Sequence, residues 1–246
     1  MSIDSEADLQ GLREAGRVVA LTLKAMREGL RAGMTTAEVD AVGREVLERH
    51  GARSAPEMVY GFPGANCISV NDEAVHGIPG PRRLRRGDIV SLDVTAELGG
   101  YMADAAVTVP VQPAAPESES LARCAESAMW SGIRAARAGR PISRIGRAVE
   151  QHVEREGFFV LRELSGHGIG RTIHEAPAIP NFETPHARTP LTDGLVITIE
   201  PIISAGSRWT RSSSDGWTLR TRDGSRAAHF EHTLVVTRDK ALVLTA

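Results

Sequence analysis

Four carboxylates and one imidazole are candidate metal ligands in this chain of 246 residues. Each lies inside a recognisable local pattern, and the set is Asp93, Asp104, His167, Glu200 and Glu231. Carboxylate oxygen combined with imidazole nitrogen suits hard to borderline divalent ions such as Mn, Fe, Co or Zn. Four carboxylate charges balance two such ions, and water between two dications can lose a proton near neutral pH. The residues therefore predict a two-ion centre for hydrolysis.

The two aspartates flank a predicted β-hairpin. Strand-like residues follow Asp93, Gly99 and Gly100 form the turn, and a second strand returns to Asp104. With the midpoint between Leu98 and Gly99, the two side chains would face each other directly, with Cβ atoms about 5 Å apart. Like charges at that distance repel, so a cation between them is favoured. An ordinary hairpin with two solvated aspartates is the alternative.

His167 and Glu231 lie in less regular sequence. Glycines on both sides of His167 allow unusual backbone dihedrals that bring the imidazole close to another group. The same stretch imitates a nucleotide-binding glycine loop, but no strand-helix-strand unit with a downstream acidic residue surrounds it. Glu231 precedes an apolar, strand-like run, and its alternative is a surface glutamate on an edge strand. His229 and His232 could be zinc ligands, although no Cys or His lies nearby at matching spacing.

An internal repeat relates the two halves of the chain. Residues 31–51 align without gaps with residues 137–157, and the strand-like run 87–93 matches 194–200 in its apolar pattern. The carboxylates that close these two runs are therefore predicted at the ends of equivalent strands. Because the runs have the composition of buried strands, a charge at their ends needs a partner, which a metal ion supplies.

A pair of helices is predicted before the strands of each half. Apolar residues recur at spacings of three and four over residues 12–30, and Gly33 is predicted to cap this helix. Thr35, with a glutamate three residues later, predicts the start of the next helix, and Gly51 predicts its end. We expect one pseudo-twofold α/β domain. Its boundaries are 1–246, with halves of about 1–115 and 116–246.

Charge and cysteine usage exclude several classes of partner. The formal net charge is only -2, so no basic field recruits nucleic acid or an anionic membrane. Cys67 and Cys124 lie far apart without CxxC spacing, which argues against a disulfide framework and fits a reducing cytoplasm. The N-terminus lacks the pattern of a signal peptide, and no apolar run of 18 residues occurs. We therefore expect a cytoplasmic protein.

Six short motifs occur in a specific order over nearly the whole chain. They are Asn71 to Pro79 (NDEAVHGIP), Asp93 to Asp104, Gly166 to Gly170 (GHGIG), Ile173-His174-Glu175, Thr198 to Pro201 (TIEP) and Glu231-His232-Thr233. Each is weak alone, but together they resemble the bacterial form of the type I methionine aminopeptidases, in metallopeptidase family M24. The resemblance implies a pita-bread fold, which is a duplicated, mainly antiparallel sheet with two helix pairs packed on it. This agrees with the internal repeat.

The resemblance also implies roles for individual residues. The five candidate ligands would hold two divalent ions, with Asp104 and Glu231 bridging both and Glu200 also carrying protons. His76 would hydrogen-bond to the scissile amide, and His174 would stabilise the oxyanion of the tetrahedral intermediate. The implied reaction removes the N-terminal methionine from peptides and nascent proteins with a small second residue. We expect a monomer, and leave open the native ion (Co, Mn, Fe or Zn) and association with the ribosome.

A pocket for the methionine side chain is a further implication of the resemblance. The residues that would line it are Val59, Phe62, Cys67, Ile173 and Trp217, and together with His76 and His174 they are the predicted substrate-binding residues. Val59 and Ile173 are aliphatic where well-known members commonly carry aromatic residues, and each lost group can change discrimination by about 1 to 3 kcal/mol. An auxiliary paralogue with altered specificity is therefore an alternative. A non-enzymatic binding protein on the same fold is a separate one.

Overall fold

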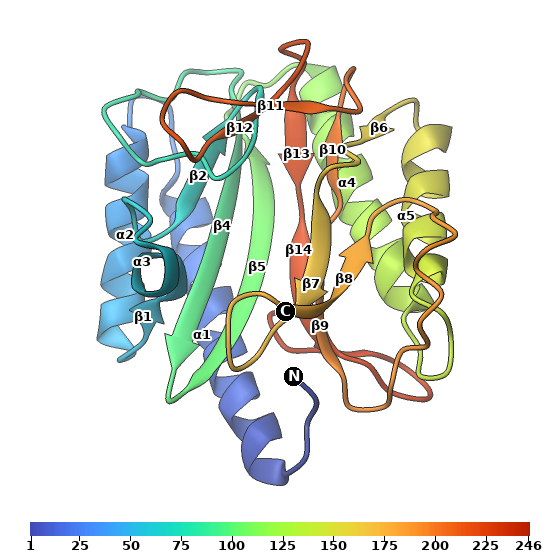
Figure 1. Cartoon of the computed structure of the whole chain (residues 1–246). Helices are drawn as coiled ribbons and strands as arrows, with labels where there is room; N and C mark the ends of the chain where they lie inside the picture. The colour runs from blue at the N-terminus through green and yellow to red at the C-terminus, as the bar shows by residue number, and fades with distance from the viewer.

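The computed structural model describes residues 1–246, and its elements follow the chain in two similar halves (Figure 1). The first half contains α1 (Glu6–Gly29), α2 (Thr36–Arg49), β1 (Arg53–Ser54), α3 (Ala55–Tyr60), β2 (Cys67–Val70), β3 (Glu73–Val75), β4 (Ile89–Leu98) and β5 (Tyr101–Pro110). The second half contains α4 (Pro116–Ala135), α5 (Ser143–Arg155), β6 (Phe159–Val160), β7 (Ser165–Gly168), β8 (Glu175–Pro180), β9 (Val196–Ile199), β10 (Ile202–Ser204), β11 (Thr210–Ser212), β12 (Leu219–Thr221), β13 (Ala227–His229), β14 (Glu231–Val235) and β15 (Leu242–Val243). Each half thus begins with two long helices, as the repeat predicted.

A nine-stranded sheet joins the two halves. Its main path runs β1-β4-β5-β14-β9-β7-β8, with β2 paired to β4 and β15 paired to β14. All of these pairs are antiparallel. Two smaller sheets, β13-β10-β6 and β11-β12-β3, adjoin it. Within the large sheet the halves meet where β5 pairs with β14, so both halves contribute to its middle. They also meet in a small sheet, where β3 pairs with β12.

The long helices cover one face of the sheet, behind it in Figure 1. Helices α1 and α2 pack together on the first-half strands, and α4 and α5 pack together in the second half. Each pair closes its own apolar cluster, with Leu23 and Leu92 in the first and Met129 and Ile199 in the second. None of the helices combines the length and apolar character that a membrane span requires. The opposite face of the sheet is left for the candidate site.

The predicted helix boundaries are correct with one exception. Thr35 and Glu38 form the capping box at the start of α2, because the Thr35 hydroxyl accepts from the Glu38 amide (3.1 Å) while the Glu38 carboxylate accepts from the Thr35 amide (2.7 Å). Gly51 follows α2 with a φ of 70°. Gly33 does not cap α1, which ends at Gly29 because the next residue is already extended. Gly33 instead takes its φ of 93° in the turn between the helices.

The hairpin register differs from the predicted one by two residues. Leu98 is paired with Tyr101, so Gly99 and Gly100 alone form the turn, and both take positive φ. Its centre falls between the two glycines, one position later than expected. Asp93 is therefore opposite Ala106 rather than opposite Asp104. Because side chains alternate along a strand, the two aspartates still share one face of the hairpin, as diagonal neighbours.

The prediction that two carboxylates end equivalent strands is correct for one of them. Glu200 directly follows β9, where Pro201 has no amide hydrogen to continue a ladder. Asp93, in contrast, lies in the middle of β4, because pairing with β5 continues as far as Leu98. The halves are related in topology without being equal in strand length.

Candidate metal centre and cavity

The five candidate ligands come from five neighbouring strands of the large sheet. β4, β5 and β7 carry Asp93, Asp104 and His167, Glu231 is the first residue of β14, and Glu200 follows β9. In the sheet these strands are consecutive, in the order β4, β5, β14, β9, β7. Strand pairing thus brings together side chains that are far apart in the sequence.

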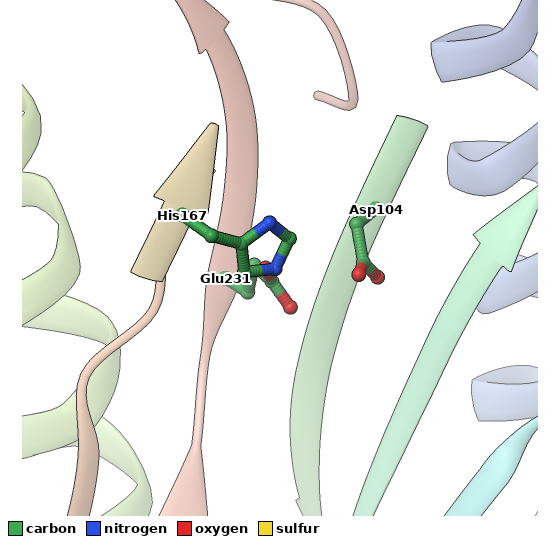
Figure 2. Close-up of side chains that lie close together, drawn as sticks. All are labelled: Asp104, His167 and Glu231. Atoms are coloured by element: carbon green, nitrogen blue, oxygen red, sulfur yellow. The ribbon is translucent and has the colours of Figure 1, made fainter. Parts of the chain in front are cut away.

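Three of these side chains point toward one another in Figure 2: Asp104, His167 and Glu231. One ligand atom of each lies within 4.8 Å of the others. The Nε2 atom of His167 also lies 3.4 Å from a carboxylate oxygen of Glu200. The Nδ1 atom of His167 is 2.9 Å from the carbonyl of Gly168, and because a carbonyl only accepts, this contact places the proton on Nδ1. The lone pair of Nε2 then faces the carboxylates.

Two buried threonines fix the strands that carry these groups. The Thr233 hydroxyl accepts from the Asp104 amide (2.9 Å) and donates to the Asp104 carbonyl (2.8 Å). The Thr198 hydroxyl accepts from the His167 amide (3.1 Å) and donates to the Glu200 carboxylate (2.9 Å). Each threonine spans two strands, so the spacing of the candidate ligands is set by the backbone as well as by their own contacts.

Burial and mutual repulsion dominate the electrostatics of the centre. Burial raises the pKa of Asp93 to about 6. Burial, followed by the charge of neighbouring carboxylates, raises the pKa of Asp104, Glu200 and Glu231 well above the usual range. Burial lowers the pKa of His167 to about 4, so its imidazole is neutral at pH 7. A cation among these groups would favour ionised carboxylates and use the neutral imidazole as a ligand.

Unpaired buried atoms test whether a divalent ion fits here. Asp104 Oδ1, Glu231 Oε1 and His229 Nε2 are buried and have no hydrogen-bond partner. An unsatisfied buried polar atom costs about 1 to 3 kcal/mol, and more when charged, so such atoms call for a ligand. Carboxylate oxygen and imidazole nitrogen are donors that Mn, Fe, Co and Zn accept. The donor set therefore fits a divalent metal centre.

A cavity of about 430 Å³ opens onto this centre. Six of the seven residues predicted for substrate binding line it, namely Phe62, Cys67, His76, Ile173, His174 and Trp217. The rings of Phe62 and Trp217 meet edge to face, with centroids 5.3 Å apart. Val59 does not line the cavity, because this part of α3 is turned to solvent and Val59 is 41% exposed. Tyr60, the last residue of α3, lines it instead.

The two histidines predicted to contact substrate lie on loops that border the cavity. His76 follows β3 in the left-handed region, with a φ of 58°. His174 precedes β8, its ring lies against that of His167 with centroids 4.2 Å apart, and its Nδ1 atom is 2.7 Å from the Tyr60 hydroxyl. Partial burial in the cavity wall lowers the pKa of His76 and of His174. Both imidazoles are therefore neutral at pH 7 and can donate a hydrogen bond.

Among the residues that line the cavity, sequence reasoning missed Tyr60 and considered His229 only as a zinc ligand paired with His232. Tyr60 carried no signal, because a short helix such as α3 does not fix from sequence which neighbour faces the cavity. The spacing of His229 in the sequence did contain a usable signal. His229 precedes Glu231 by two positions, the spacing that puts two side chains on one face of an extended segment, yet its partners were sought among Cys and His rather than among carboxylates.

Comparisons with known proteins agree along the whole chain. The model of metallopeptidase family M24 matches residues 10–238. "Methionine aminopeptidase 2" of Bacillus subtilis is 42% identical over 247 residues, which cover 100% of this chain and 99% of that protein. The methionine aminopeptidase of Clostridium perfringens is 39% identical over 243 residues, covering 99% of this chain and 98% of that protein.

Solved structures of related proteins also have the same fold as this chain. The crystal structure of methionine aminopeptidase from Rickettsia prowazekii matches with a TM-score of 0.96 at 36% identity, covering 100% of both chains. A prolidase from Pyrococcus furiosus matches with a TM-score of 0.80 at 22% identity, and its match covers 99% of this chain but 65% of that one. The prolidase shares the fold alone. The predicted duplicated, mainly antiparallel pita-bread architecture is confirmed.

Proposed function

The chain belongs to metallopeptidase family M24, and from this premise we propose that it is an aminopeptidase that removes the N-terminal methionine of peptides and nascent proteins with a small second residue. The observation that carries the proposal is a buried cluster of carboxylates and imidazole at a cavity of suitable size. Relatives that match over their full length are named methionine aminopeptidases. A chain of this family binds divalent metal.

We assign two divalent ions to the centre, with Co, Mn, Fe or Zn as the candidate metals. Asp93, Asp104, His167, Glu200 and Glu231 would hold them, and Asp104 and Glu231 would be shared between them. When bound, such ions supply Lewis-acid polarisation of water and of the peptide carbonyl. The raised pKa values of the carboxylates, caused by burial and mutual repulsion, are the expected property of a site built to receive positive charge.

Glu200 is the proposed carrier of protons. One of its oxygens accepts from Thr198, and the carboxyl group lies on the cavity wall. A carboxyl group with a raised pKa can take a proton from the attacking water and give it to the leaving amine. Both transfers need a group within hydrogen-bond reach of the reacting atoms, which its place on the wall allows.

His76 and His174 are the proposed hydrogen-bond donors to the substrate. Both line the cavity, and both are neutral at pH 7. His76 would contact the scissile amide, and His174 would stabilise the oxyanion. The Tyr60 hydroxyl near Nδ1 of His174 supports the second role, because a tyrosine that donates to Nδ1 leaves the proton on Nε2. Donors of this kind lower the barrier by about 3 kcal/mol.

The methionine side chain is proposed to lie between Phe62, Cys67, Ile173 and Trp217. These side chains belong to the apolar part of the cavity wall, which also includes Val75, Leu164 and Ile202. Ile173 is smaller than an aromatic residue, which favours a second candidate, an auxiliary paralogue with broader side-chain specificity. The chain would act as a monomer in the cytoplasm, with residues 1–246 as one catalytic domain that acts on N-terminal methionine.

Peptide hydrolysis by the reconstituted protein tests the proposal. Metal-free protein is loaded separately with Mn, Fe, Co or Zn and given Met-Ala-Ser, Met-Gly-Met-Met, Leu-Ala-Ser or Ala-Pro-Ala. We expect metal-dependent release of free methionine from the first two peptides only. Cleavage of Leu-Ala-Ser at a comparable rate would support the paralogue with broader specificity. No cleavage with any metal would favour a binding protein on the same fold and refute the enzyme.

A further inference from the structure

His229 places a sixth side chain with a metal-ligand atom at the carboxylate cluster, outside the five candidate ligands. It is the last residue of β13, its side chain is 2% exposed, and its Nε2 atom has no hydrogen-bond partner. Nε2 lies 3.5 Å from Glu231 Oε2 and 3.7 Å from Glu200 Oε2. One ligand atom from each of these three residues lies within 4.8 Å of the others. A buried, unpaired nitrogen is thus directed at two carboxylates.

The spacing of these atoms distinguishes a ligand from a hydrogen-bond donor. N–H···O hydrogen bonds have donor–acceptor distances up to about 3.2 Å, so both contacts are too long for a hydrogen bond. Two donor atoms bound to one ion at about 2.1 Å each, at angles near 90° to 110°, lie about 3.0 to 3.4 Å apart. The distances from His229 are within a few tenths of an ångström of this spacing. They resemble the 3.4 Å between His167 Nε2 and Glu200 Oε1.

Glu200 lies between the two imidazoles. Its Oε1 atom faces His167, and its Oε2 atom faces His229. The backbone of His229 is held by Thr108, whose hydroxyl accepts from the His229 amide (2.8 Å) and donates to the His229 carbonyl (2.7 Å). The main-chain groups are therefore satisfied, and the imidazole nitrogen is the group left for a ligand.

We propose that His229 is a sixth protein ligand of the metal centre and binds, through Nε2, the ion held by Glu200 and Glu231. This assignment rests on the metal centre of the proposed function and adds a residue to it. Glu231 is then shared by two three-residue sets, one with Asp104 and His167 and the other with Glu200 and His229. A second imidazole gives the centre more nitrogen character, which favours Fe, Co or Zn over Mn.

X-ray absorption of the cobalt-loaded protein counts the imidazoles directly. Wild-type protein is loaded with Co(II) alone, the metal content is measured, and the Co–imidazole scattering is fitted. We expect two imidazoles per chain in the wild type and one in His229→Gln. Glutamine replaces the imidazole with a carboxamide that can still donate a hydrogen bond. His232→Gln is the matched control, because this nearby imidazole bonds to Thr245 instead, and its count should stay at two.

Each result of this experiment has a defined meaning. One imidazole in the wild type, or an unchanged count in His229→Gln, overturns the ligand, even if cobalt binding weakens. If His229→Gln does not fold, His229→Asn replaces it, and the wild-type count alone already supports or refutes two imidazoles. Wild-type protein that holds no cobalt refutes the whole centre, including this assignment. Protein that holds cobalt on two imidazoles but releases no methionine supports the ligand and refutes the proposed activity.

Discussion

The metal centre and the side-chain wall of the cavity are built from different structures. The centre takes its candidate ligands from five adjacent strands, with threonine hydroxyls linking those strands. The wall takes Tyr60 from a six-residue helix, and His76 and His174 from loops. A strand paired on both sides has little freedom to move, whereas loop positions are set by fewer contacts. The candidate metal ligands are therefore more tightly constrained than the side chains of the wall.

Asp104→Asn should have the largest effect, because it alters the centre itself. The substitution keeps the volume but removes one carboxylate charge from the group of four. We expect at least a thousandfold loss of kcat/KM on Met-Ala-Ser, equivalent to about 4 kcal/mol, with a native circular dichroism spectrum. Asp239→Asn, at an exposed position, is the control and should be fully active. Near-normal turnover by metal-loaded Asp104→Asn would contradict the assignment of this aspartate.

His174→Ala should have the next largest effect, and it tests whether the wall also contributes to chemistry. Loss of a donor to the oxyanion is expected to lower kcat about 100-fold, close to 3 kcal/mol, with little change in KM. Steady-state kinetics on Met-Ala-Ser measure the two constants separately. His186→Ala, at an exposed histidine, controls for loss of an imidazole elsewhere. A rise in KM at constant kcat would instead assign His174 to binding alone.

The strands that carry the candidate metal ligands were easier to predict from sequence than the side chains of the cavity wall, for a physical reason. Strand periodicity and the repeat are local signals, and they placed Glu200 at the end of a strand correctly. The pairing of Asp93 with Asp104 was wrong by two residues, because the turn is centred between Gly99 and Gly100 and not between Leu98 and Gly99. His229 could not be connected to Glu200 from sequence, because strands β13 and β10 join them only in the folded sheet.

The wall was harder to predict because spacing carries less information there. Val59 and Tyr60 are adjacent on α3, and the structure places only the second at the cavity. Which of two neighbours faces inward depends on how this short helix docks. Ile173 and Trp217 were predicted to line the pocket from the resemblance to a family alone. A family resemblance implies loop conformations, which sequence periodicity does not.

Removal of metal should make stability depend on pH through the centre. Burial and repulsion raise the folded-state pKa values of its carboxyl groups, so the folded chain holds protons more tightly than the unfolded chain. This contribution is fully present below pH 4 and is lost as pH rises through the folded-state pKa values. Asp93 alone, with a pKa of about 6 when folded against about 4 when unfolded, corresponds to about 3 kcal/mol.

Thermal unfolding of the EDTA-treated protein checks this sign. The Tm should fall between pH 7 and pH 8.5, above the range where the buried histidines His167, His229 and His232, whose pKa values are lowered by burial, add stability with rising pH. Asp104→Asn should flatten the slope because it removes one source of repulsion. Added Co(II) should raise the Tm most at the upper end of the range, where the carboxylates are ionised. A Tm of the metal-free protein that rises over this interval would mean that the carboxyl groups are not held at raised pKa values.

Tyr60→Phe should have the smallest effect, and it tests whether Tyr60 positions the imidazole of His174. The substitution removes only the hydroxyl that lies 2.7 Å from Nδ1 of His174, a contact worth about 1 kcal/mol. We expect kcat to fall about fivefold with KM nearly unchanged, because His174 would lose its fixed orientation but keep its place. Met58→Ala, an exposed neighbour on α3, should leave both constants unchanged.

A double-mutant cycle separates this role from general packing. If Tyr60 acts through His174, the double variant Tyr60→Phe/His174→Ala should be no slower than His174→Ala alone. Independent, multiplying losses would mean that Tyr60 contacts the substrate itself. The result therefore shows whether this part of the wall acts only through His174. If it does, Tyr60 can be replaced without disturbing the carboxylates that the five strands hold in place.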